Sequence, residues 1–238
     1  MEKVTFLAVF LFAYTVQAIT GFAGNIFCMP AGTYTLGFQN SVSIVNSTGV
    51  IGCGLLALIY RRNICWRELG KIVAVMTPFV ALGAWLDTLI PLNALLKIYG
   101  AVIVLIGLKN LLVKKQSFMP EWALYVVIAL AGLIQGMFVS GGALLVIYAV
   151  QKIKDKDEFR ATLSALWAIL NFLYAAFQFS QGNFNEDVWF VILCCIPLIA
   201  LATFIGSVLA KRISQQRFLK LTYVLLLIVG SVLFVTSF

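Results

Sequence analysis

Long apolar segments, separated by short polar or charged stretches, run through the whole chain. Residues 4–60 contain no charged side chain, and this run is far longer than the ~20 residues that cross a bilayer once. Run lengths and charge breaks together predict eight helical segments. These segments are 4–37, 39–60, 72–90, 92–113, 121–150, 161–181, 188–210 and 219–238. The pattern therefore predicts an all-α polytopic membrane protein.

Composition supports the same class. Of the 238 residues, 62% are hydrophobic and 11% are charged, and the mean hydropathy is +1.02, whereas soluble domains carry roughly 45–50% apolar and about 25% charged residues. The net charge of +8 would suggest nucleic-acid binding in a soluble protein. Here the basic residues lie in short loops, where they report orientation in the membrane instead. We therefore expect the lipid bilayer as a partner and no nucleic acid; a homodimer is compatible with the sequence.

The sequence lacks the residues that several kinds of catalysis need. The chain has no histidine and no GxxxxGK[ST] motif, which excludes histidine-based acid–base catalysis and a P-loop of its own. The five cysteines form no CxxC pair, so most are expected to be packing residues. We expect no catalytic residues, no metal site and no cofactor, hence a protein that is not an enzyme. A thiol-dependent membrane enzyme remains the alternative from a different class.

The two halves of the chain resemble each other in order. Residues 78–83 (PFVALG) match 197–202 (PLIALA), and residues 23–25 fall opposite 140–142. A third match relates Lys97, ten residues before Gly107, to Lys220, ten residues before Gly230. Offsets that grow slowly from 117 to 123 are typical of a duplication. The predicted repeats are 1–115 and 116–238, within one transmembrane domain.

The loop charges require the two repeats to be inverted. Fifteen of the 17 basic residues fall in four loops, after segments two, four, five and seven. Eight simple crossings would place these loops on opposite sides of the membrane, against the positive-inside rule. The conflict disappears if segments one and five are broken hairpins that return to the side from which they enter. Each repeat then has one re-entrant-like hairpin and three transmembrane helices.

Both hairpins have a glycine-rich break. The first is predicted to have arms at 4–20 and 26–36 around a break at 21–25, and the second to have arms at 122–135 and 143–150 around a break at 136–142. Both termini are then expected on the outer side of the cytoplasmic (inner) membrane. The first segment also resembles a cleavable signal peptide, but the repeat needs it, so we expect it to be retained.

Broken helices at corresponding places in inverted halves point to a transporter's binding site near the middle of the membrane. A half-helix that starts after a break directs free N–H groups and about half a positive charge at a cavity, which suits a small anion. Polar residues near the breaks could complete the site. The candidate substrate-binding residues are Gln17, Gly21, Gly24, Asn25, Asn46, Gln135, Ser140, Gly141, Gly142, Thr162 and Asn171.

Structural alternatives remain open for these residues. The glycines could allow close helix packing, as expected for Gly132 and Gly136, and the polar side chains could form ordinary interhelical hydrogen bonds. Arg160 either draws anions to the inner mouth or simply sets topology. Cys28 either contacts a sulfur-containing substrate or packs.

Two regions of the sequence resemble the sulfite exporter TauE/SafE family. They are residues 21–30 (GFAGNIFCMP), and residues 136–147 (GMFVSGGALLVI) followed by 154–162 (KDKDEFRAT). Ala23 and Asn25 stand where the family commonly has glycine. The resemblance covers essentially the whole chain and implies transport of sulfite, sulfonates or related organic anions across the cytoplasmic membrane.

Charge placement suggests the direction of transport. Asp87, near the outer end of its segment, is the deepest carboxylate that we place in a span, so an acidic relay for ion coupling is not evident. With the inside negative, outward movement of a monovalent anion gains about 2.3 kcal/mol per 100 mV. We therefore expect an exporter that works by alternating access, with an anion channel as the near alternative.

Overall fold

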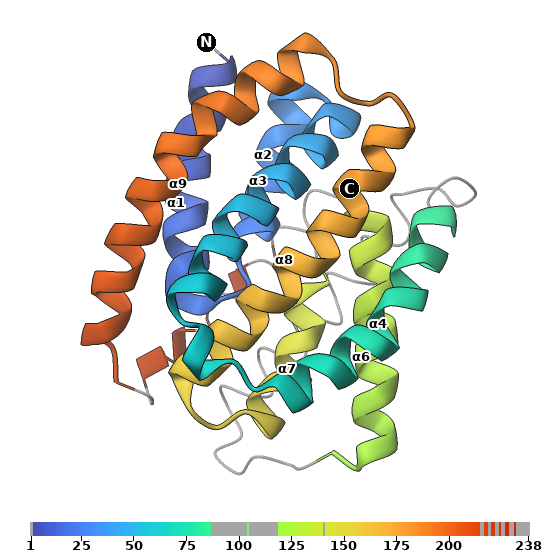
Figure 1. Ribbon diagram of the computed structural model, residues 1–238, viewed down its shortest axis with the longest axis vertical. Coiled ribbons are helices and arrows are strands. Elements are labelled where there is room, and N and C mark those ends of the chain that lie inside the picture. Colours follow the sequence, from blue (N-terminus) through green and yellow to red (C-terminus); the bar gives the residue numbers. More distant parts are fainter. Residues whose placement is uncertain are drawn as a thin grey trace. The chain divides into compact units, whose positions relative to one another are not determined.

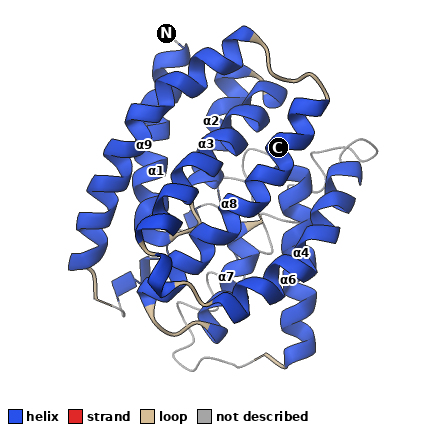
Figure 2. Ribbon diagram, in the orientation of Figure 1, coloured by secondary structure: helices blue, strands red, loops and turns tan. Residues whose placement is uncertain are grey.

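The computed structural model describes residues 2–86, 104, 119–139, 141–214, 217–218, 220–221, 224, 227–228 and 231. Among these residues the regular structure is helical throughout, without a strand (Figures 1 and 2). The elements are α1 (Glu2–Thr20), α2 (Gly24–Leu36), α3 (Phe38–Ile59), η1 (Arg61–Asn63), α4 (Trp66–Leu86), α6 (Glu121–Phe138), α7 (Gly142–Lys152), α8 (Lys156–Ser180) and α9 (Glu186–Arg212). The all-α prediction is confirmed for this part of the chain.

Five of these helices are long and apolar enough to cross a membrane, namely α1, α3, α4, α8 and α9. Both predicted hairpins are present as pairs of helices, α1 with α2 and α6 with α7. Pro78 and Pro197, which the repeat aligns, both lie inside helices, α4 and α9. The segments predicted at 92–113 and 219–238 lie largely outside the described residues. The inverted orientation of the repeats stays a prediction.

The chain forms two compact units, which do not coincide with the sequence halves. The first unit holds residues 1–74 and 153–212, and the second holds 75–152 and 213–238. Each unit thus combines elements from both predicted repeats. The boundary near residue 115 was predicted from sequence duplication. The division into compact units does not test it, so it stays a prediction.

In the first unit, α3 runs along α8, and α1 runs along α9 (Figure 1). Small residues allow the helices to approach closely, as is common in membranes. A Cβ added at Gly52 of α3 would lie 2.7 Å from Cε1 of Tyr14 on α1, and one at Gly206 of α9 would lie 2.5 Å from Cβ of Ala18. These contacts fix the end of α1 between its neighbours.

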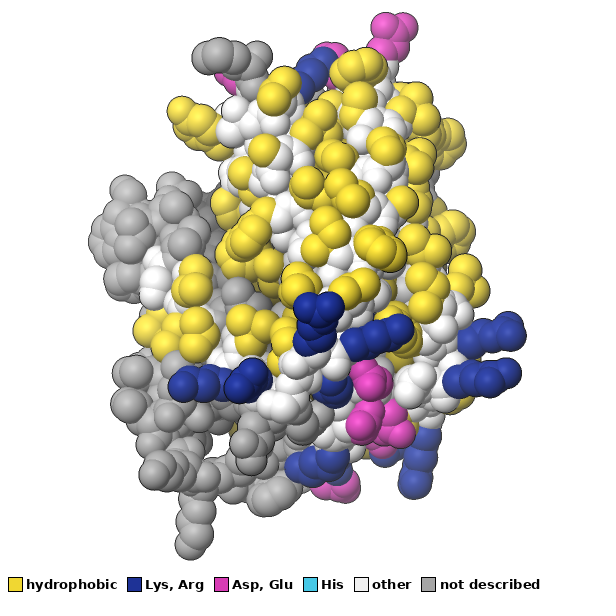
Figure 3. All heavy atoms as spheres, turned by 90° about the vertical axis from the view of Figure 1, so that its left-hand side faces the viewer, with side chains coloured by type: hydrophobic (Ala, Val, Ile, Leu, Met, Phe, Trp, Pro, Cys, Tyr) yellow, Lys and Arg dark blue, Asp and Glu magenta, His cyan; other side chains and the backbone are white. Residues whose placement is uncertain are grey.

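The outer surface of this unit is apolar between two polar ends. Leu193 and Phe204 of α9 are exposed by 63% and 69%, and Figure 3 shows apolar side chains over this face with lysines and arginines gathered toward one end. Lys156 at the start of α8 donates to the carbonyl oxygen of Ala210 near the end of α9 (3.1 Å). The basic termini of α3, α8 and α9 therefore share one end of the unit.

The opposite end of the first unit is nearly neutral. There Lys3 of α1 forms an ion pair with Asp187 of α9 (2.6 Å), and Gln39 of α3 donates to Gln178 of α8 (2.9 Å). A band of exposed apolar residues bounded by a basic and a nearly neutral end is the arrangement expected of a membrane-spanning bundle.

In the second unit, glycines bring α6 close to the part of α4 that follows Ala74. A Cβ at Gly132 would lie 2.7 Å from the carbonyl oxygen of Met76, and one at Gly136 would overlap that of Val80. The packing alternative for Gly132 and Gly136 is confirmed. The prediction that Gly136 opens the second break is wrong, because α6 continues to Phe138.

Candidate functional site

The first break separates α1 from α2 by three residues and is held by Gln17. Its backbone oxygen accepts the N–H of Gly21 (2.7 Å), which has a left-handed φ of 85°. Its side-chain Oε1 accepts the N–H of Gly24, the first residue of α2 (2.6 Å). One glutamine therefore ties the end of α1 to the start of α2. The predicted break at 21–25 is two residues too long, because α2 includes Gly24 and Asn25.

The second break is held by the same device. The backbone oxygen of Gln135 accepts the N–H of Val139 (2.9 Å), which is left-handed with a φ of 54°. The Oε1 of Gln135 accepts the N–H of Gly141 (3.0 Å), directly before α7 begins at Gly142. Gln17 and Gln135 thus perform the same two tasks, one position away from the register in which the repeat aligns residues 23–25 with 140–142. Ser140 lies outside the described residues.

Each hairpin has one glycine, Gly24 or Gly141, at a position where a side chain would not fit between the arms. A Cβ at Gly24 would lie 2.8 Å from Cβ of Gln17, and one at Gly141 would overlap the carbonyl oxygen of Ala131 and lie 2.9 Å from Cβ of Gln135. Glycine therefore lets the arms close tightly enough for the glutamine to reach. At Gly24 and Gly141, glycine is thus needed both for close packing of the two arms and for the hydrogen bond to the glutamine side chain.

The N–H groups at the first break are largely used by the protein itself. Thr20 Oγ1 accepts from the backbone nitrogens of Phe22 and Ala23, at 3.5 and 3.4 Å, and Gln17 takes that of Gly24. The free N–H groups that we expected at this break are therefore mostly bonded within the protein, and anion binding there would need a further donor. Asn25, half-buried in the first turn of α2, is one candidate.

Arg160, for which the sequence left two interpretations open, is a second candidate for that donor. Asp155 caps α8 by accepting the N–H groups of Asp157 and Glu158 (2.8 and 3.0 Å), so Arg160 lies in the second turn. Its side chain is only 4% exposed. Its Nε and Nη2 both donate to the carbonyl oxygen of Ala18, at 3.0 and 2.5 Å. The guanidinium thus covers the exposed carbonyl end of α1.

The guanidinium of Arg160 also contacts two other groups. Its Cζ lies 4.9 Å from the ring centroid of Tyr60. Its Nη1 lies 3.6 Å from Oδ1 of Asp157, a carboxylate that is 43% exposed, and this separation is too long for a hydrogen bond. A Cβ at Gly21 would lie 3.0 Å from Cα of Arg160, so the break glycine gives α8 access. The signal that could have identified Arg160 is its place within the second family-like region.

These contacts also locate the first break along the helices. Gln17 Nε2 donates to Sγ of Cys53 (3.3 Å), and Arg160 stacks on Tyr60, which directly follows α3. The break therefore lies beside the last third of α3, nearer the basic end of the unit than the helix centre. The sequence predicted a site midway along the spans. The contacts with Cys53 and Tyr60 instead place the first break toward one end of α3.

The remaining candidates take different roles. The Oγ1 of Thr162 accepts the N–H of Cys65 (2.9 Å) and so fixes the loop after η1. Asn46 donates through Nδ2 to the carbonyl oxygen of Val42 (2.8 Å), but its Oδ1 has no hydrogen-bond partner. Asn171 is completely buried, and neither Nδ2 nor Oδ1 has a partner. Asn171 therefore forms none of the interhelical hydrogen bonds that were the structural alternative for this residue.

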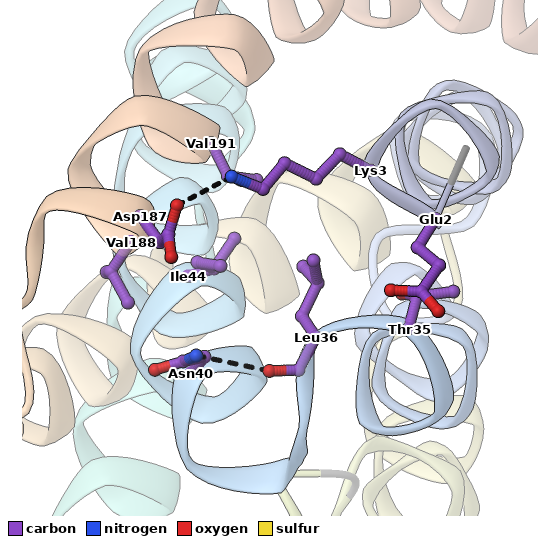
Figure 4. A pocket seen from close by; sticks show the side chains of 9 residues that line it. All are labelled: Glu2, Lys3, Thr35, Leu36, Asn40, Ile44, Asp187, Val188 and Val191. Atoms are coloured by element: carbon purple, nitrogen blue, oxygen red, sulfur yellow. Dashed lines mark hydrogen bonds and ion pairs between the residues drawn. The ribbon is translucent and has the colours of Figure 1, made fainter.

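A cavity of about 210 Å³ lies at the nearly neutral end of the first unit (Figure 4). The Lys3–Asp187 ion pair borders it. Its lining consists of Glu2, Lys3, Thr35, Leu36, Asn40, Ile44, Asp187, Val188 and Val191. Sequence reasoning did not identify this cavity, because its residues come from four helix ends that no sequence pattern relates.

The described residues include no group of three or more His, Cys, Asp or Glu side chains that could hold a metal ion. All five cysteines are free, and Cys28, Cys53 and Cys195 are buried. Cys28 is completely buried within α2, as its packing interpretation requires.

Comparison with known proteins adds the following. The family described as Sulfite exporter TauE/SafE matches residues 6–233. The chain is 23% identical over 175 residues to the Probable inner membrane transporter protein TsaS of Comamonas testosteroni, a match that covers 71% of this chain and 72% of that protein. No solved structure gives a significant match.

Proposed function

Since this chain belongs to the TauE/SafE family of membrane transporters, we propose that it carries small sulfur-containing anions, such as sulfite or organosulfonates, across the cytoplasmic membrane. The observation that carries this proposal is the buried Arg160 at the first helix break. A cation at this place gives the break an affinity for anions that its partly used N–H groups alone would lack.

The charge of Arg160 is only partly satisfied within the protein. Buried charges are normally paired and hydrogen-bonded, and Arg160 forms an ion pair with Asp157 at 3.6 Å, but this carboxylate is 43% exposed and too distant for a hydrogen bond. A guanidinium has five N–H donors, and the two hydrogen bonds to Ala18 leave donors on Nη1 and Nη2. An oxyanion bound there would neutralise the charge and accept these hydrogen bonds.

The second hairpin provides the matching half of the transporter. The side chain of Gln135 accepts the N–H of Gly141 as that of Gln17 accepts the N–H of Gly24, which supports the proposed duplication. In our proposal the two halves exchange conformations to open each side of the membrane in turn. The candidate residues of the second site are Gln135, Ser140, Gly141 and Gly142.

The charges support the proposed orientation and direction. If the basic end of the first unit is cytoplasmic, as the positive-inside rule requires, the N-terminal end of α1 and the cavity beside Lys3 face outward, and the inverted repeat places the C-terminus on the same side. All carboxylates in the described part of the chain lie in first helical turns or a cap, namely Glu2, Glu68, Glu121, Asp155, Asp157, Glu158, Glu186 and Asp187. Without an acidic relay inside a described span, the membrane potential is the simplest driving force, and it favours anion export.

Counterflow into proteoliposomes tests this proposal. Vesicles preloaded with unlabelled sulfite should take up radiolabelled sulfite faster than empty vesicles, with saturation. Absence of both properties at high flux would instead identify an anion channel. A wild-type protein that moves no sulfur anion would contradict the proposed function as a whole.

The role of Arg160 is tested in the same assay. Arg160→Gln should abolish counterflow, whereas Arg62→Gln, which removes an exposed charge at the same end of the unit, should retain it. Arg160→Lys, which keeps the charge but loses the planar fork, should give an intermediate rate. Normal counterflow by the correctly folded Arg160→Gln variant would rule out Arg160 as the anion-binding cation.

A further inference from the structure

A seam of unpartnered polar atoms lies between α3 and α8. Asn46 Oδ1, Trp167 Nε1 and both side-chain polar atoms of Asn171 are buried without a hydrogen bond. Asn46 and Asn171 are fully buried, and Trp167 is 4% exposed. A buried polar atom without a hydrogen bond destabilises the folded state, and native structures contain few of them. Their concentration on two packed helices indicates a ligand.

The three residues share one face of contact. A Cβ at Gly49 of α3 would overlap the Asn171 amide, so Asn171 lies directly against α3. Asn46 is three residues from Gly49, and Trp167 is four residues from Asn171. Side chains at these spacings lie on the same side of their helices. In the antiparallel pair, Asn46 therefore lies about one turn to one side of the contact between Gly49 and Asn171, and Trp167 lies about one turn to the other side.

The seam leads toward the first break. Gly49 and Asn171 are in contact, as are Tyr60 and Arg160, each eleven positions further along the antiparallel pair. In this register Trp167 lies level with Cys53, whose Sγ accepts from Gln17. Along α8, Trp167 thus lies about two turns from Arg160, at the level of the side-chain contact between Gln17 and Cys53.

We propose that this seam binds the head group of an oxyanion that keeps one proton, which among sulfur anions means hydrogensulfite. This inference rests on the proposed function. Trp167 Nε1 and Asn171 Nδ2 can donate to the oxygens of such an anion, and an Oδ1 of Asn46 or Asn171 can accept from its hydroxyl. A fully deprotonated dianion lacks that hydroxyl, so it would leave an amide oxygen facing negative charge. The seam therefore selects the monoanion.

Cations fit this group of atoms less well. Hard cations prefer several oxygen ligands, usually including carboxylates, whereas the seam offers two amide oxygens beside two N–H donors. Ordered water matches the donors and acceptors equally well, and it is an outcome that the experiment below must separate from anion binding.

Calorimetric titration of the purified protein with sulfite at a series of pH values tests the proposal. Above the pH at which hydrogensulfite loses its proton, the apparent Kd for total sulfite should rise about tenfold per pH unit, because the bound form becomes that much scarcer. Methanesulfonate has sulfonyl oxygens but no ionisable hydroxyl. It should bind at least about tenfold more weakly than hydrogensulfite, with a Kd independent of pH.

Methanesulfonate also controls for titration of the protein. The titratable or charged groups on α8 and on the elements packed against α3 and α8 are Glu2, Lys3, Tyr14, Cys28, Tyr34, Cys53, Arg61, Arg62, Lys156, Asp157, Glu158, Arg160, Tyr174, Glu186, Asp187, Cys194, Cys195, Lys211 and Arg212, together with Tyr60 and Asp155 at the helix ends. If one of these groups caused the pH effect, binding of both anions would follow pH in the same way, and the proposal would be overturned.

Variants locate the effect in the seam. Asn46→Leu and Asn171→Leu should each weaken sulfite binding about tenfold, toward the methanesulfonate value, and Trp167→Phe should do so by loss of one donor. Ser43→Ala, which removes a hydroxyl bonded within its own helix, is the matched control and should bind like wild type. Asn46 and Trp167 keep the test decisive if the Asn171 variant fails to fold.

The outcomes separate this proposal from the proposed function. Wild-type sulfite binding that ignores pH, or leucine variants that bind like wild type, would mean that the seam holds only water, while transport by the Arg160 site would stand. A protein that binds and transports no sulfur anion would contradict both.

Discussion

The guanidinium of Arg160 donates two hydrogen bonds to the carbonyl oxygen of Ala18, 142 residues earlier in the chain. This contact joins the last turn of α1 to the second turn of α8, across the first helix break. Because the carbonyl groups at a helix C-terminus carry partial negative charge, the arginine both completes the end of α1 and lowers the cost of its own burial. The guanidinium also lies over the ring of Tyr60, with Cζ 4.9 Å from the ring centroid.

Replacing Tyr60 should show how much the aromatic ring contributes. Tyr60→Leu removes the ring under the guanidinium and should lower the free energy of unfolding by about 1 kcal/mol, the usual range for a partly desolvated cation–π contact. Tyr60→Phe keeps the ring face and should behave like wild type. Thermal unfolding of the detergent-solubilised protein measures both. Equal destabilisation by the two variants would show that the hydroxyl, not the ring, is what matters.

The two glutamine ties should be equally important. Gln17→Leu and Gln135→Leu leave the N–H of Gly24 or Gly141 without its acceptor, and each should lower the free energy of unfolding by roughly 1–3 kcal/mol. Both should also reduce counterflow strongly, since the break loses its shape. Gln39→Leu removes a half-buried hydrogen bond far from the breaks and is the matched control. If Gln39→Leu proved as harmful as the other two, the ties would have no special role.

Alanine at the break glycines should have unequal effects. At Gly141 a Cβ meets the backbone oxygen of Ala131, which cannot move without opening the hairpin, whereas at Gly24 it meets the side chain of Gln17. Gly141→Ala should therefore destabilise by about 1–3 kcal/mol and Gly24→Ala by less. Gly54→Ala, where a Cβ meets nothing within 4 Å, should be neutral. Thermal unfolding measures all three, and the reverse order for Gly141 and Gly24 would contradict this account.

Sequence reasoning predicted the helices and the hairpins well because both follow from local patterns. Apolar run length gave α3 within a residue at each end, and glycine clusters gave both breaks. Gly136 was misassigned because a glycine that allows close packing of α6 on α4 looks the same in sequence as one that ends a helix.

The site was less predictable because its key contacts are not local. Gln17 and Gln135 were chosen for lying beside the breaks, but their action as acceptors for Gly24 and Gly141 depends on the chain reversal. The burial of Arg160 could not be predicted from charge patterning alone, since it depends on contacts with Ala18 and Gly21, which lie about 140 residues earlier in the chain.

Removal of all five cysteines should leave transport within about twofold of wild type, a difference of under 1 kcal/mol in the barrier. Cys28 and Cys195 should be replaced by alanine, because they are buried packing residues, and Cys53 by serine, because it accepts a hydrogen bond from Gln17. Serine or alanine suits the half-buried Cys65 and Cys194. Counterflow measures the outcome. Loss of activity in a folded cysteine-free protein would favour the thiol-dependent alternative.

The cysteine-free protein then allows the orientation of the first unit to be measured. Single cysteines at Lys3 and Asp187, both at the nearly neutral end, should react with a membrane-impermeant maleimide added to intact spheroplasts. Single cysteines at the exposed Arg62 and Lys211 should react only after the membrane is opened, because the basic end faces the cytoplasm. The opposite labelling pattern would reverse the unit, place Arg160 at the outer side, and remove the argument that the membrane potential drives export.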